Sequence, residues 1–304
     1  MPITLPKAAI NLNGEILAPE QAAVNIFDRG FLYGDSLYEV ARTYGNTFLH
    51  LEAHLDRLEQ SARLCHMTLG QSTAEYRTQI YRTLEALRQD YKKEGKPTPE
   101  VYCRIIVTRG IGKIGFGLNC LLSPTQYVII AQPFDPFTFE QVQTGMKLQV
   151  SHRLRNDRRA LDPAMKSGNY LNNLLAYLES SSDGFDDALL CDSQGFVTEG
   201  TTFNIFYVKN NIIVTPPLDV GILDGITRRS VLEVAHHNGF ETRECRFPKA
   251  RLYEADEIFM TSSLREVFPV TQVDHIKPGQ GFPGKVTVQL RQLFQKQIRE
   301  WTHS

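Results

Sequence analysis

Apolar side chains recur along this chain with the period of a helix in some segments and of a strand in others. The clearest helical case is residues 169–180, where leucines follow the three- and four-residue spacing of a helix with one buried face. Ser167–Asn169, just before it, supply cap-forming side chains and a flexible turn. We therefore predict a helix that begins just after Lys166, and this places the lysine at a strand end or tight turn. The apolar positions are Leu171, Leu174, Leu175 and Leu178.

The same patterns predict the other elements of the chain. Helices are predicted at residues 50–64, 74–93, 227–238 and 286–301. Strands are predicted in LYEVART, VYCRIIVTRG, QYVIIAQPF, KLQVSHRL, DDALLCD, GFVTEG, TFNIFYVKNNIIVTP (with a turn at residues 209–211) and EIFMTSS. Strands and helices mix without a repeating βαβ rhythm, so the pattern favours an α+β fold over a doubly wound sheet.

Length and proline content predict two domains. A chain of 304 residues with 42% apolar side chains exceeds a typical small domain and can bury a sizeable core. The segment PFDPFTFE contains two prolines and shows neither a helical nor a strand pattern. We therefore expect an N-terminal domain at residues 1–132, a linker at 133–140 and a C-terminal domain at 141–304.

Charge and cysteine content exclude several classes of partner. The 33 basic residues nearly balance the 34 acidic ones, so nothing indicates binding to nucleic acid or to a membrane surface. No apolar run approaches a membrane span, and the N-terminal MPITLPKAAINLNGE has no unbroken apolar core. The cysteines show no CxxC or metal-ligand spacing, so we expect no metal site. They are interpreted as reduced core thiols, which is typical of a cytoplasmic protein. They are Cys65, Cys103, Cys120, Cys191 and Cys245.

Several separated segments carry polar residues that could belong to an active site or could have an ordinary structural role. Lys166 could be a solvated lysine at a helix start, Arg57 a surface residue of its helix, Arg42 a solvated strand residue and TEGTTFNIF a hairpin turn. In GILDGITRRSV, however, a helix begins at the Gly-Ile-Thr, so its N–H groups and the Thr227 hydroxyl converge as in phosphate sites. The hydroxyls of Thr261–Ser263 end a strand and complete a predicted phosphate cup.

Together these parts match the needs of a pyridoxal phosphate site. A lysine amine forms the Schiff base, and a carboxylate beside the pyridine nitrogen keeps that nitrogen protonated, so that the ring can accept electrons. A lysine at a helix threshold, a phosphate cup, a glutamate and an arginine are all present in the chain. The residues therefore predict this cofactor before any family is considered.

Ordered motifs over about residues 11–294 resemble the class IV aminotransferases, which are the fold-type IV pyridoxal phosphate enzymes. The motifs are FDRGFLYGDSLYEVARTY, HLDRL, MKSGNYLNNLLA, TEGTTFNIF, GILDGITRRSV and FMTSSLREVFPV. The resemblance implies a two-domain α+β subunit with a smaller N-terminal α/β domain and a larger, barrel-like C-terminal domain. It also implies a cofactor held between the domains and a homodimer in which a loop of the partner subunit completes each active site.

The resemblance also implies roles for particular residues. Lys166 matches the Schiff-base lysine and proton shuttle, and Glu199 matches the carboxylate at the pyridine nitrogen. Leu223 matches the residue under the ring, and Tyr170 matches a tyrosine that binds the phenolic oxygen, although branched-chain relatives often have one more residue between the lysine and this tyrosine. The predicted phosphate-binding residues are Arg57, Ile226 (through its backbone N–H), Thr227 and Ser263.

Substrate residues resemble those of branched-chain amino acid aminotransferases, with two departures. Here Tyr38–Arg42 reads YEVAR where those enzymes usually have FEGIR, which is closer to D-amino acid aminotransferases. Ser262–Arg265 replaces their Gly-Thr-Ala-Ala turn, and this places Leu264 and Arg265 beside the substrate carboxylate. The segment RGIGKIGFG resembles the loop that reaches the partner subunit. The predicted substrate residues are Tyr33, Tyr38, Arg42, Tyr102, Arg104, Leu264 and Arg265.

We therefore expect a ping-pong transaminase that moves an amino group from an amino acid, with branched-chain L-amino acids favoured, to a 2-oxo acid such as 2-oxoglutarate. D-amino acid aminotransferase and (R)-amine transaminase remain alternatives. Aminodeoxychorismate lyase, which would use the same residues to eliminate pyruvate, is a further one. A catalytically silent binding protein is disfavoured, because Lys166 and Glu199 are both present.

Overall fold

The computed structural model describes residues 5–303, which divide into two compact units. The first unit comprises the chain up to Pro136 together with Met165–Asn169, and the second comprises Phe137–Ala164 and the chain from Tyr170 onward. Each unit has its own sheet and its own apolar core. In the segment that the sequence marks as a linker, β6 ends at Pro133 and α4 begins at Phe139, with the Thr138 side chain as its N-cap.

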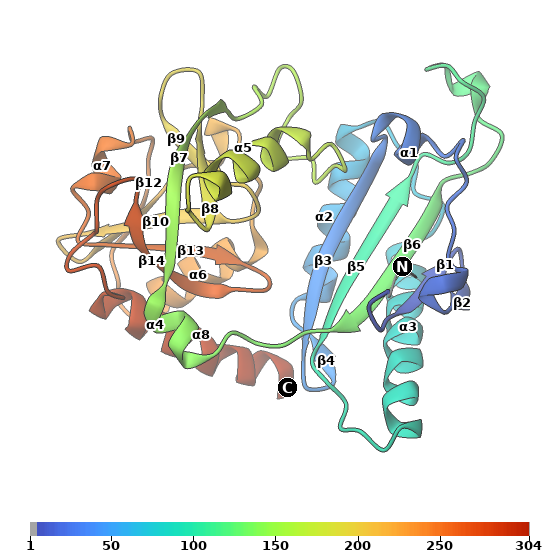
Figure 1. The fold of residues 1–304 in the computed structure, drawn as a ribbon, viewed down its shortest axis with the longest axis horizontal. Helices are drawn as coiled ribbons and strands as arrows, with labels where there is room; N and C mark the ends of the chain where they lie inside the picture. Colours follow the sequence, from blue (N-terminus) through green and yellow to red (C-terminus); the bar gives the residue numbers. More distant parts are fainter. Residues whose placement is uncertain (1–4, 304) are drawn as a thin grey trace. The chain divides into compact units, whose positions relative to one another are not determined.

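Figure 1 labels the strands and the α-helices of the first unit. Its strands are β1 (Ala9–Leu12), β2 (Glu15–Leu17), β3 (Ser36–Tyr44), β4 (Thr47–Phe48), β5 (Val101–Thr108) and β6 (Gln126–Pro133). Its helical segments are η1 (Pro19–Gln21), α1 (Arg29–Tyr33), α2 (Leu51–Leu64), α3 (Thr73–Lys93) and η2 (Leu118–Cys120).

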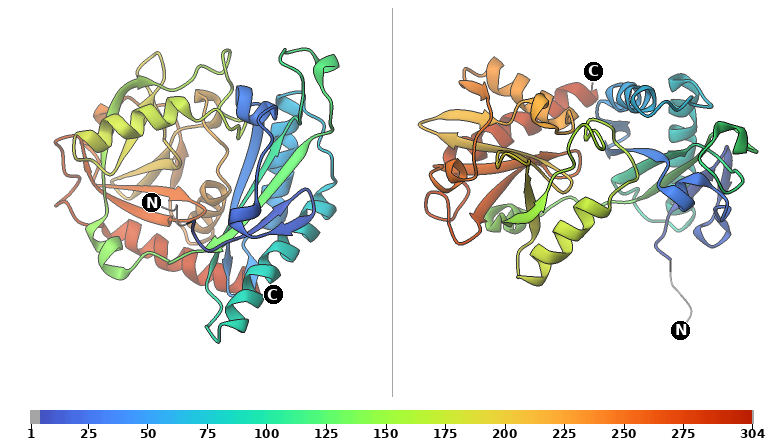
Figure 2. Two further views of the ribbon diagram at one scale, coloured as in Figure 1. Left: turned by 45° about the vertical axis from the view of Figure 1, so that its right-hand side comes forward. Right: turned by 90° about the horizontal axis from the view of Figure 1, so that it is seen from above.

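The sheet of the first unit is antiparallel, with strand order β2-β1-β6-β5-β3-β4. Helices α2 and α3 cover one of its faces (Figures 1 and 2). Because successive side chains of a strand point to opposite faces, β5 buries Val101, Cys103 and Ile105 in the core under the helices. Tyr102 and Arg104 alternate with them and are only half-buried. The uncovered face of this sheet therefore carries two of the predicted substrate residues.

The second unit contains the remaining elements. Its strands are β7 (Met146–Leu154), β8 (Asp187–Cys191), β9 (Val197–Gly200), β10 (Asn204–Lys209), β11 (Ile212–Thr215), β12 (Thr242–Glu244), β13 (Glu257–Ser262) and β14 (Glu266–Val273). Its helical segments are α4 (Phe139–Thr144), α5 (Leu171–Ser182), η3 (Leu218–Val220), α6 (Ile226–His237), α7 (Ala250–Tyr253) and α8 (Lys285–His303).

The sheet of the second unit has the order β12-β11-β10-β13-β14-β7-β8-β9, in which β7 runs parallel to both of its neighbours. The sheet curls back on itself, because its last strand β9 also contacts β10, where Gly200 N donates to Phe203 O at 2.9 Å. Helix α8 packs on β13 and β14, α6 packs on β13 and on α8, and α5 packs on β7 and β8. This curled sheet fits the predicted barrel-like domain.

Helix α5 corrects the prediction that its leucines form a buried face. Leu171, Leu174 and Leu178 are 66%, 47% and 52% exposed, and the buried residues of the helix include Asn173 and Ala176. The helix turns its small and polar side toward β7 and β8, so these three leucines cover no core within residues 5–303, while Leu175 is half-buried. The predicted cap is also wrong: the N-cap residue is Tyr170, without a side-chain cap, while the Asn169 side chain donates to Gly34 O at 2.9 Å.

Strand β14 was not predicted, because its sequence shows no period-two alternation. Nearly all of its residues are buried, and a strand that is covered on both faces loses the alternating pattern. Pro269 within it further obscures the strand signal.

The cysteines are free thiols, as predicted, but they are not all core residues. Cys103 and Cys191 are buried, whereas Cys245 is exposed and the other two are half-buried. Among residues 5–303, none of the helices combines the length and the apolar character that a membrane crossing requires.

Candidate active site

Lys166 lies on the edge of strand β3 in the first unit. Ser167 forms an isolated antiparallel bridge with Leu37, and Tyr38 N donates to Lys166 O at 2.9 Å. The backbone N–H of Lys166 donates to the Ser61 Oγ of α2 at 3.2 Å. The main chain on both sides of the lysine carbonyl is therefore anchored. The sequence predicts a strand end or tight turn here, and the structure places the lysine beside an isolated bridge on the edge of β3.

The Lys166 amine contacts Tyr38 of β3. Its Nζ donates to the Tyr38 hydroxyl at 3.1 Å and lies 4.4 Å from the centre of the ring. The Arg104 guanidinium stacks on the same ring at 4.3 Å. Tyr38 is only 4% exposed, so the amine is held by a side chain that is itself fixed by packing and by a cation on its ring. The structure thus brings together Lys166, Tyr38 and Arg104, which the sequence had assigned to catalysis and substrate binding.

Four predicted substrate residues share one face of the first sheet. In the β3–β5 register, Arg42 lies opposite Tyr102, and Val40 lies opposite Arg104. Directly opposite residues of an antiparallel pair point to the same face, and so do alternate residues of one strand. Tyr38, Arg42, Tyr102 and Arg104 therefore all project from the face that α2 and α3 leave uncovered. Arg42 is buried and stacks on Tyr44 and Phe134, so the alternative of a solvated arginine is wrong.

Arg57 belongs to a buried ion pair that the sequence did not reveal. Its Nε and Nη2 donate to the two carboxylate oxygens of Glu39 at 2.7 and 2.8 Å, and His54 Nδ1 lies 2.8 Å from Glu39 Oε2. Burial alone would raise the pKa of Glu39, but Arg57 and His54 together hold it well below its usual range. Burial lowers the pKa of His54, although the hydrogen bond to Glu39 and its negative charge act to raise it. Arg57 is 7% exposed, so it is no ordinary surface residue of its helix.

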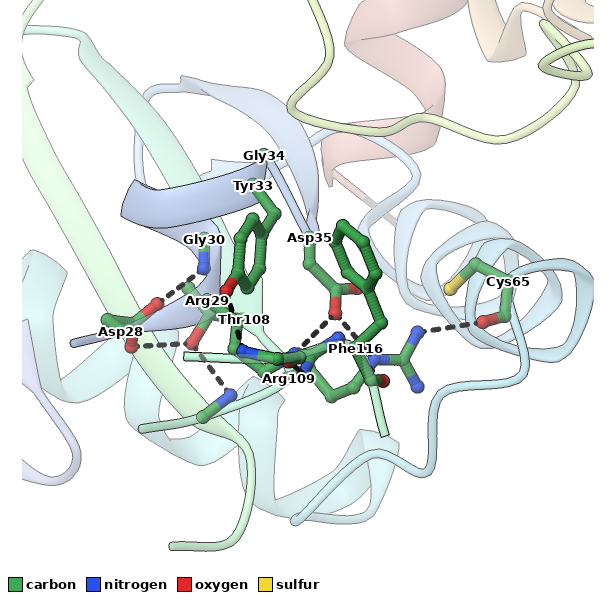
Figure 3. A network of polar contacts seen from close by, with 12 residues as sticks. Asp28, Arg29, Gly30, Tyr33, Gly34, Asp35, Cys65, Thr108, Arg109 and Phe116 are labelled. Atoms are coloured by element: carbon green, nitrogen blue, oxygen red, sulfur yellow. Dashed lines mark hydrogen bonds and ion pairs between the residues drawn. The ribbon is translucent and has the colours of Figure 1, made fainter. Parts of the chain in front are cut away.

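Tyr33 contacts the glycine-rich loop that follows β5 (Figure 3). Its hydroxyl accepts the Gly115 N–H at 3.0 Å, and its ring lies 5.2 Å from the Phe116 ring. Arg29 donates to Gly115 O at 2.8 Å and also to Asp35 at 3.0 Å. The loop is thus tied to helix α1, while Phe116 stays 81% exposed.

Asp35 joins two arginines of this network. Besides Arg29, it accepts from Arg109 Nε at 2.7 Å, and Arg109 continues to Cys65 O at 2.9 Å (Figure 3). These charges were not predicted as site residues. Asp35 therefore lies between two largely buried arginines and links α1 to the end of β5.

Glu199 lies in the second unit with both of its oxygens engaged. Its Oε1 accepts from Arg155 Nε at 3.0 Å and lies 2.9 Å from Arg155 Nη2, and its Oε2 accepts the Leu223 N–H at 3.0 Å. Glu199 is 4% exposed and belongs to strand β9, so it is more than the turn residue of a hairpin. Burial and the nearby charge of Glu199 raise the pKa of Tyr170. Glu199, Leu223 and Tyr170, all predicted, therefore belong to one cluster.

Helix α6 begins in the segment that the sequence predicts as part of a phosphate cup. Ile226 and Thr227 open the helix after the N-cap Gly225, which supplies no side-chain cap. A Cβ at Gly225 would lie 2.0 Å from the amide oxygen of Asn204, whose strand neighbour in β13 is Thr261. Among the described residues, the buried Thr261 Oγ1 has no hydrogen-bond partner. Open N–H groups beside a buried, unpartnered hydroxyl suit an anionic oxygen ligand.

Ser263, Leu264 and Arg265 form the turn between β13 and β14. Arg265 N donates to Ser262 Oγ at 3.2 Å, and its guanidinium lies 3.5 Å from Thr202 Oγ1 and 4.0 Å from Asp187 Oδ2. The Arg265 side chain is 24% exposed. Both contacts are long: the first is a hydrogen bond to the Thr202 hydroxyl, and the second is an ion pair with Asp187.

The supporting residues that sequence reasoning missed left only weak signals. Asn173 is a polar residue inside a leucine-rich helix, and Arg155 directly follows a strand. Glu39 and His54 stand at positions that pattern alone assigns to the core: Glu39 lies between the buried Leu37 and Ala41 on the same face of β3. A buried charged residue is the shared signal, but its partner can be identified only in the folded chain.

Comparisons with known proteins identify the family. The chain matches the family described as Amino-transferase class IV over residues 36–273. A putative branched-chain-amino-acid aminotransferase of Methanocaldococcus jannaschii is 36% identical over 292 residues, which cover 96% of this chain and 97% of that protein. A D-alanine aminotransferase of Bacillus licheniformis is 31% identical over 286 residues, which cover 94% and 95%.

Solved structures support the same family. The branched-chain amino acid aminotransferase of Escherichia coli has a TM-score of 0.85 at 31% identity, and the match covers 97% of this chain and 96% of that one. Another branched-chain amino acid aminotransferase, solved with pyridoxamine 5'-phosphate, has the same TM-score of 0.85 at 28% identity. The chain therefore belongs to the class IV aminotransferases and is an enzyme. The predicted family and its two-domain α+β fold are confirmed, and the enzymes of this family depend on pyridoxal phosphate.

Proposed function

We propose that this enzyme is a transaminase that uses pyridoxal phosphate to move an amino group from a branched-chain L-amino acid to a 2-oxo acid such as 2-oxoglutarate. When bound, this cofactor stores the amino group between two half-reactions, so donor and acceptor use the site in turn. The observation that carries the proposal is Lys166, whose main chain is anchored on the edge of β3 and whose amine is held by the buried Tyr38 hydroxyl.

Lys166 is proposed to hold the cofactor through its Nζ. Once a donor amine had displaced it, the free lysine amine would serve as the base that accepts the proton of the donor Cα, and then as the acid that gives this proton up again on the same side. The hydrogen bond from Nζ to Tyr38 at 3.1 Å supports this role, because it gives a flexible lysine side chain one preferred direction.

Glu199 is proposed to hold the pyridine nitrogen in its protonated form. A carboxylate oxygen accepts two hydrogen bonds, and among the described residues the Leu223 N–H is the one donor that reaches Oε2. Oε2 therefore keeps an acceptor position for a ring N–H. The Tyr170 hydroxyl is proposed to bind the phenolic oxygen, and Leu223 to pack under the ring.

The cofactor phosphate is proposed to bind the N–H groups and hydroxyls at the start of α6, and the residues present fit such a group. The helix begins without a side-chain cap, which leaves the N–H groups of Ile226 and Thr227 for an anion, and the Thr261 hydroxyl lacks a partner in the described part of the chain. Ser263 of the following turn and Arg57 complete the proposed phosphate-binding set.

The substrate is proposed to use the uncovered sheet face of the first unit. That face presents the guanidinium groups of Arg42 and Arg104 beside the rings of Tyr38 and Tyr102, which suits a carboxylate with an apolar side chain. The 36% identity to a branched-chain relative favours L-leucine-like donors. The Tyr38 hydroxyl, absent from the usual FEGIR motif, and the 31% identity to a D-alanine aminotransferase support D-amino acids as the second candidate.

A homodimer in which the loop after β5 completes the partner's site is also proposed. Large apolar side chains that this chain does not cover support it: Leu171, Leu174 and Leu178 on α5, and Ile114, Phe116 and Leu118 in the loop are 47–81% exposed. Light scattering should give twice the mass of the chain, and Leu174→Glu together with Leu178→Glu should shift it toward one chain. A monomeric wild type would contradict the dimer.

The cofactor assignment is tested by borohydride reduction. With pyridoxal phosphate, reduction should fix the cofactor on the peptide that contains Lys166, and Lys166→Ala should lose both this adduct and turnover. Lys147→Ala, an exposed lysine of β7, is the matched control and should behave as wild type. A stable adduct on another lysine would overturn the assignment.

The donor is tested with L-leucine, D-alanine and (R)-1-phenylethylamine against 2-oxoglutarate and pyruvate. A higher kcat/KM with L-leucine supports the branched-chain proposal, and a higher value with D-alanine replaces it by the second candidate. Release of pyruvate from aminodeoxychorismate without an amino acceptor would instead indicate a lyase.

A further inference from the structure

The environment of Glu199 contains a cation that none of the predicted roles uses. Arg155 directly follows strand β7, and its backbone N–H donates to Cys191 O of β8 at 2.8 Å. All three nitrogens of its guanidinium are engaged: Nε and Nη2 face Glu199 Oε1, and Nη1 donates to the Asn173 amide oxygen at 3.2 Å. The Arg155 side chain is 11% exposed, so this arrangement is largely shielded from water.

Asn173 fixes this arginine from the other side. It lies on the buried side of α5, and its amide nitrogen donates to Thr201 O at 2.5 Å, two residues beyond Glu199. The same amide group therefore contacts both the guanidinium and the main chain that carries the glutamate. Arg155 cannot swing away from Glu199 without breaking contacts to two neighbouring elements.

Arg155 distinguishes the two oxygens of Glu199. Oε1 is occupied by the guanidinium, whereas Oε2 receives only the Leu223 N–H among the described residues. The carboxylate plane is thus set by two groups, the Arg155 guanidinium and the Leu223 N–H, and the remaining acceptor direction belongs to Oε2. A buried carboxylate that lost this partner would be driven toward its neutral form, because burial disfavours an uncompensated charge.

We propose that Arg155 is a positioning residue of the transaminase: it keeps Glu199 charged and turns Oε2 toward the ring nitrogen of the cofactor. This inference rests on the proposed function. Arg155 does not itself touch the cofactor or the substrate in this role, and it acts through Glu199. Asn173 is its support, because it binds the guanidinium nitrogen that Glu199 does not use.

The test is a double-mutant cycle on the complete enzyme with pyridoxal phosphate. The variants are Arg155→Gln, Arg155→Lys, Glu199→Gln and Arg155→Gln combined with Glu199→Gln. Arg153→Gln is the matched control, because Arg153 lies two residues earlier and pairs with Glu179 on the surface. Four quantities are measured: the single-turnover rate with an amino donor, the dissociation constant of the cofactor, the pH dependence of the visible absorption band of the resting enzyme, and the Tm of the cofactor-free protein.

Arg155→Gln should slow the single turnover on the order of 100-fold, because breaking a buried ion pair is costly, and cofactor affinity should fall much less. Its absorption band should change with pH in the same direction as that of Glu199→Gln. Adding Arg155→Gln to Glu199→Gln should cause little further loss, because one residue acts through the other. Arg155→Lys should restore part of the rate, since it keeps the charge and loses the fork.

Independent, multiplicative losses that follow the drop in Tm would show that Arg155 only supports the fold, and they would overturn the inference. So would an Arg155→Gln enzyme with the spectrum and rate of the wild type. If Arg155→Gln does not fold, an Arg155→Lys enzyme with unchanged rate and spectrum overturns the inference in its place. A wild type that binds no pyridoxal phosphate would instead overturn the proposed function, and this inference with it.

Discussion

The two units of this enzyme hold their charged residues with opposite arrangements. In the first unit a carboxylate, Glu39, holds the cation Arg57, and His54 supports the carboxylate. In the second unit a cation, Arg155, holds the carboxylate Glu199. A buried charge needs a partner of opposite sign, so in each unit the supporting residue is as essential as the residue it supports.

The difference between the two arrangements lies in the geometry of the pair. Glu39 takes Nε and Nη2 of Arg57 on two separate oxygens, a bidentate contact that uses the whole carboxylate. Arg155 instead meets one oxygen of Glu199 and leaves the other to a backbone N–H. The first pair therefore fixes the cation on both carboxylate oxygens. The second leaves Oε2 with one donor among the described residues, and this is the oxygen that we propose for the ring N–H of the cofactor.

Glu39→Gln should have the largest effect on stability. It leaves the Arg57 charge buried without its partner, which costs about 3–5 kcal/mol. Chemical denaturation should show this loss, with Tm falling in parallel. The matched control is Glu52→Gln on α2, whose pair with Arg77 is exposed, so its effect should stay below about 1 kcal/mol. Equal effects of the two substitutions would contradict the buried-pair interpretation.

Glu199→Gln should reduce turnover more than it reduces cofactor affinity. Gln keeps the shape but loses the charge-assisted bond to the ring nitrogen, which contributes about 1.5–3 kcal/mol, so kcat should fall about 10- to 100-fold. Steady-state kinetics and a cofactor titration measure the two effects. Glu179→Gln, a surface glutamate, is the control. Proportional losses in kcat and in affinity would argue against the role.

His54→Gln should weaken the response of stability to acid. Burial lowers the pKa of His54 in the folded chain. Below about pH 6.5 the imidazole therefore binds a proton in the unfolded chain but stays neutral in the folded chain, and the free energy of unfolding falls as the pH falls. The groups that face His54 are Glu39, Arg57 and Lys166. Denaturation at pH 7.5 and at pH 5.5 should therefore show a smaller difference for the variant, by about 1 kcal/mol or less.

Asp187 in the second unit provides the contrast to this effect. Burial raises its pKa, so its contribution to stability is present at low pH and is lost as the pH rises through the folded pKa. Asp187→Asn should change the acid response with the opposite sign to His54→Gln. Changes of the same sign in both variants would show that the two units do not differ in this way.

Arg265→Ala should have the smallest effect on stability, below about 1 kcal/mol, because its contacts to Thr202 and Asp187 are long and partly exposed. If it binds a substrate carboxylate, KM for 2-oxoglutarate should rise about tenfold, while a neutral keto substrate keeps its KM. Kinetics with both acceptors measure this. An unchanged KM for every acceptor would remove Arg265 from the site.

Much of the fold follows from local pattern. The helices α2, α3, α6 and α8 lie within one or two residues of their predicted bounds, because apolar spacing and caps such as Ser72 with Glu75 act within a few residues. Strand β14 was missed, because burial on both of its faces removes the alternation of apolar and polar residues. The burial of the α5 leucines was predicted wrongly, because an apolar stripe indicates that one face of a helix needs a cover but does not indicate which surface provides it.

The sequence by itself determined the family, the fold class and the candidate residues Lys166 and Glu199, because ordered motifs and local spacing survive without coordinates. Only the tertiary structure decided what surrounds those residues. Tyr38 holds the Lys166 amine from a neighbouring strand, and Arg155 meets Glu199 from 44 positions away in the chain. Such pairings depend on strand register and on the path of the sheet, which no local pattern encodes, and so the residues that set the chemistry of a site appear only when the chain is folded.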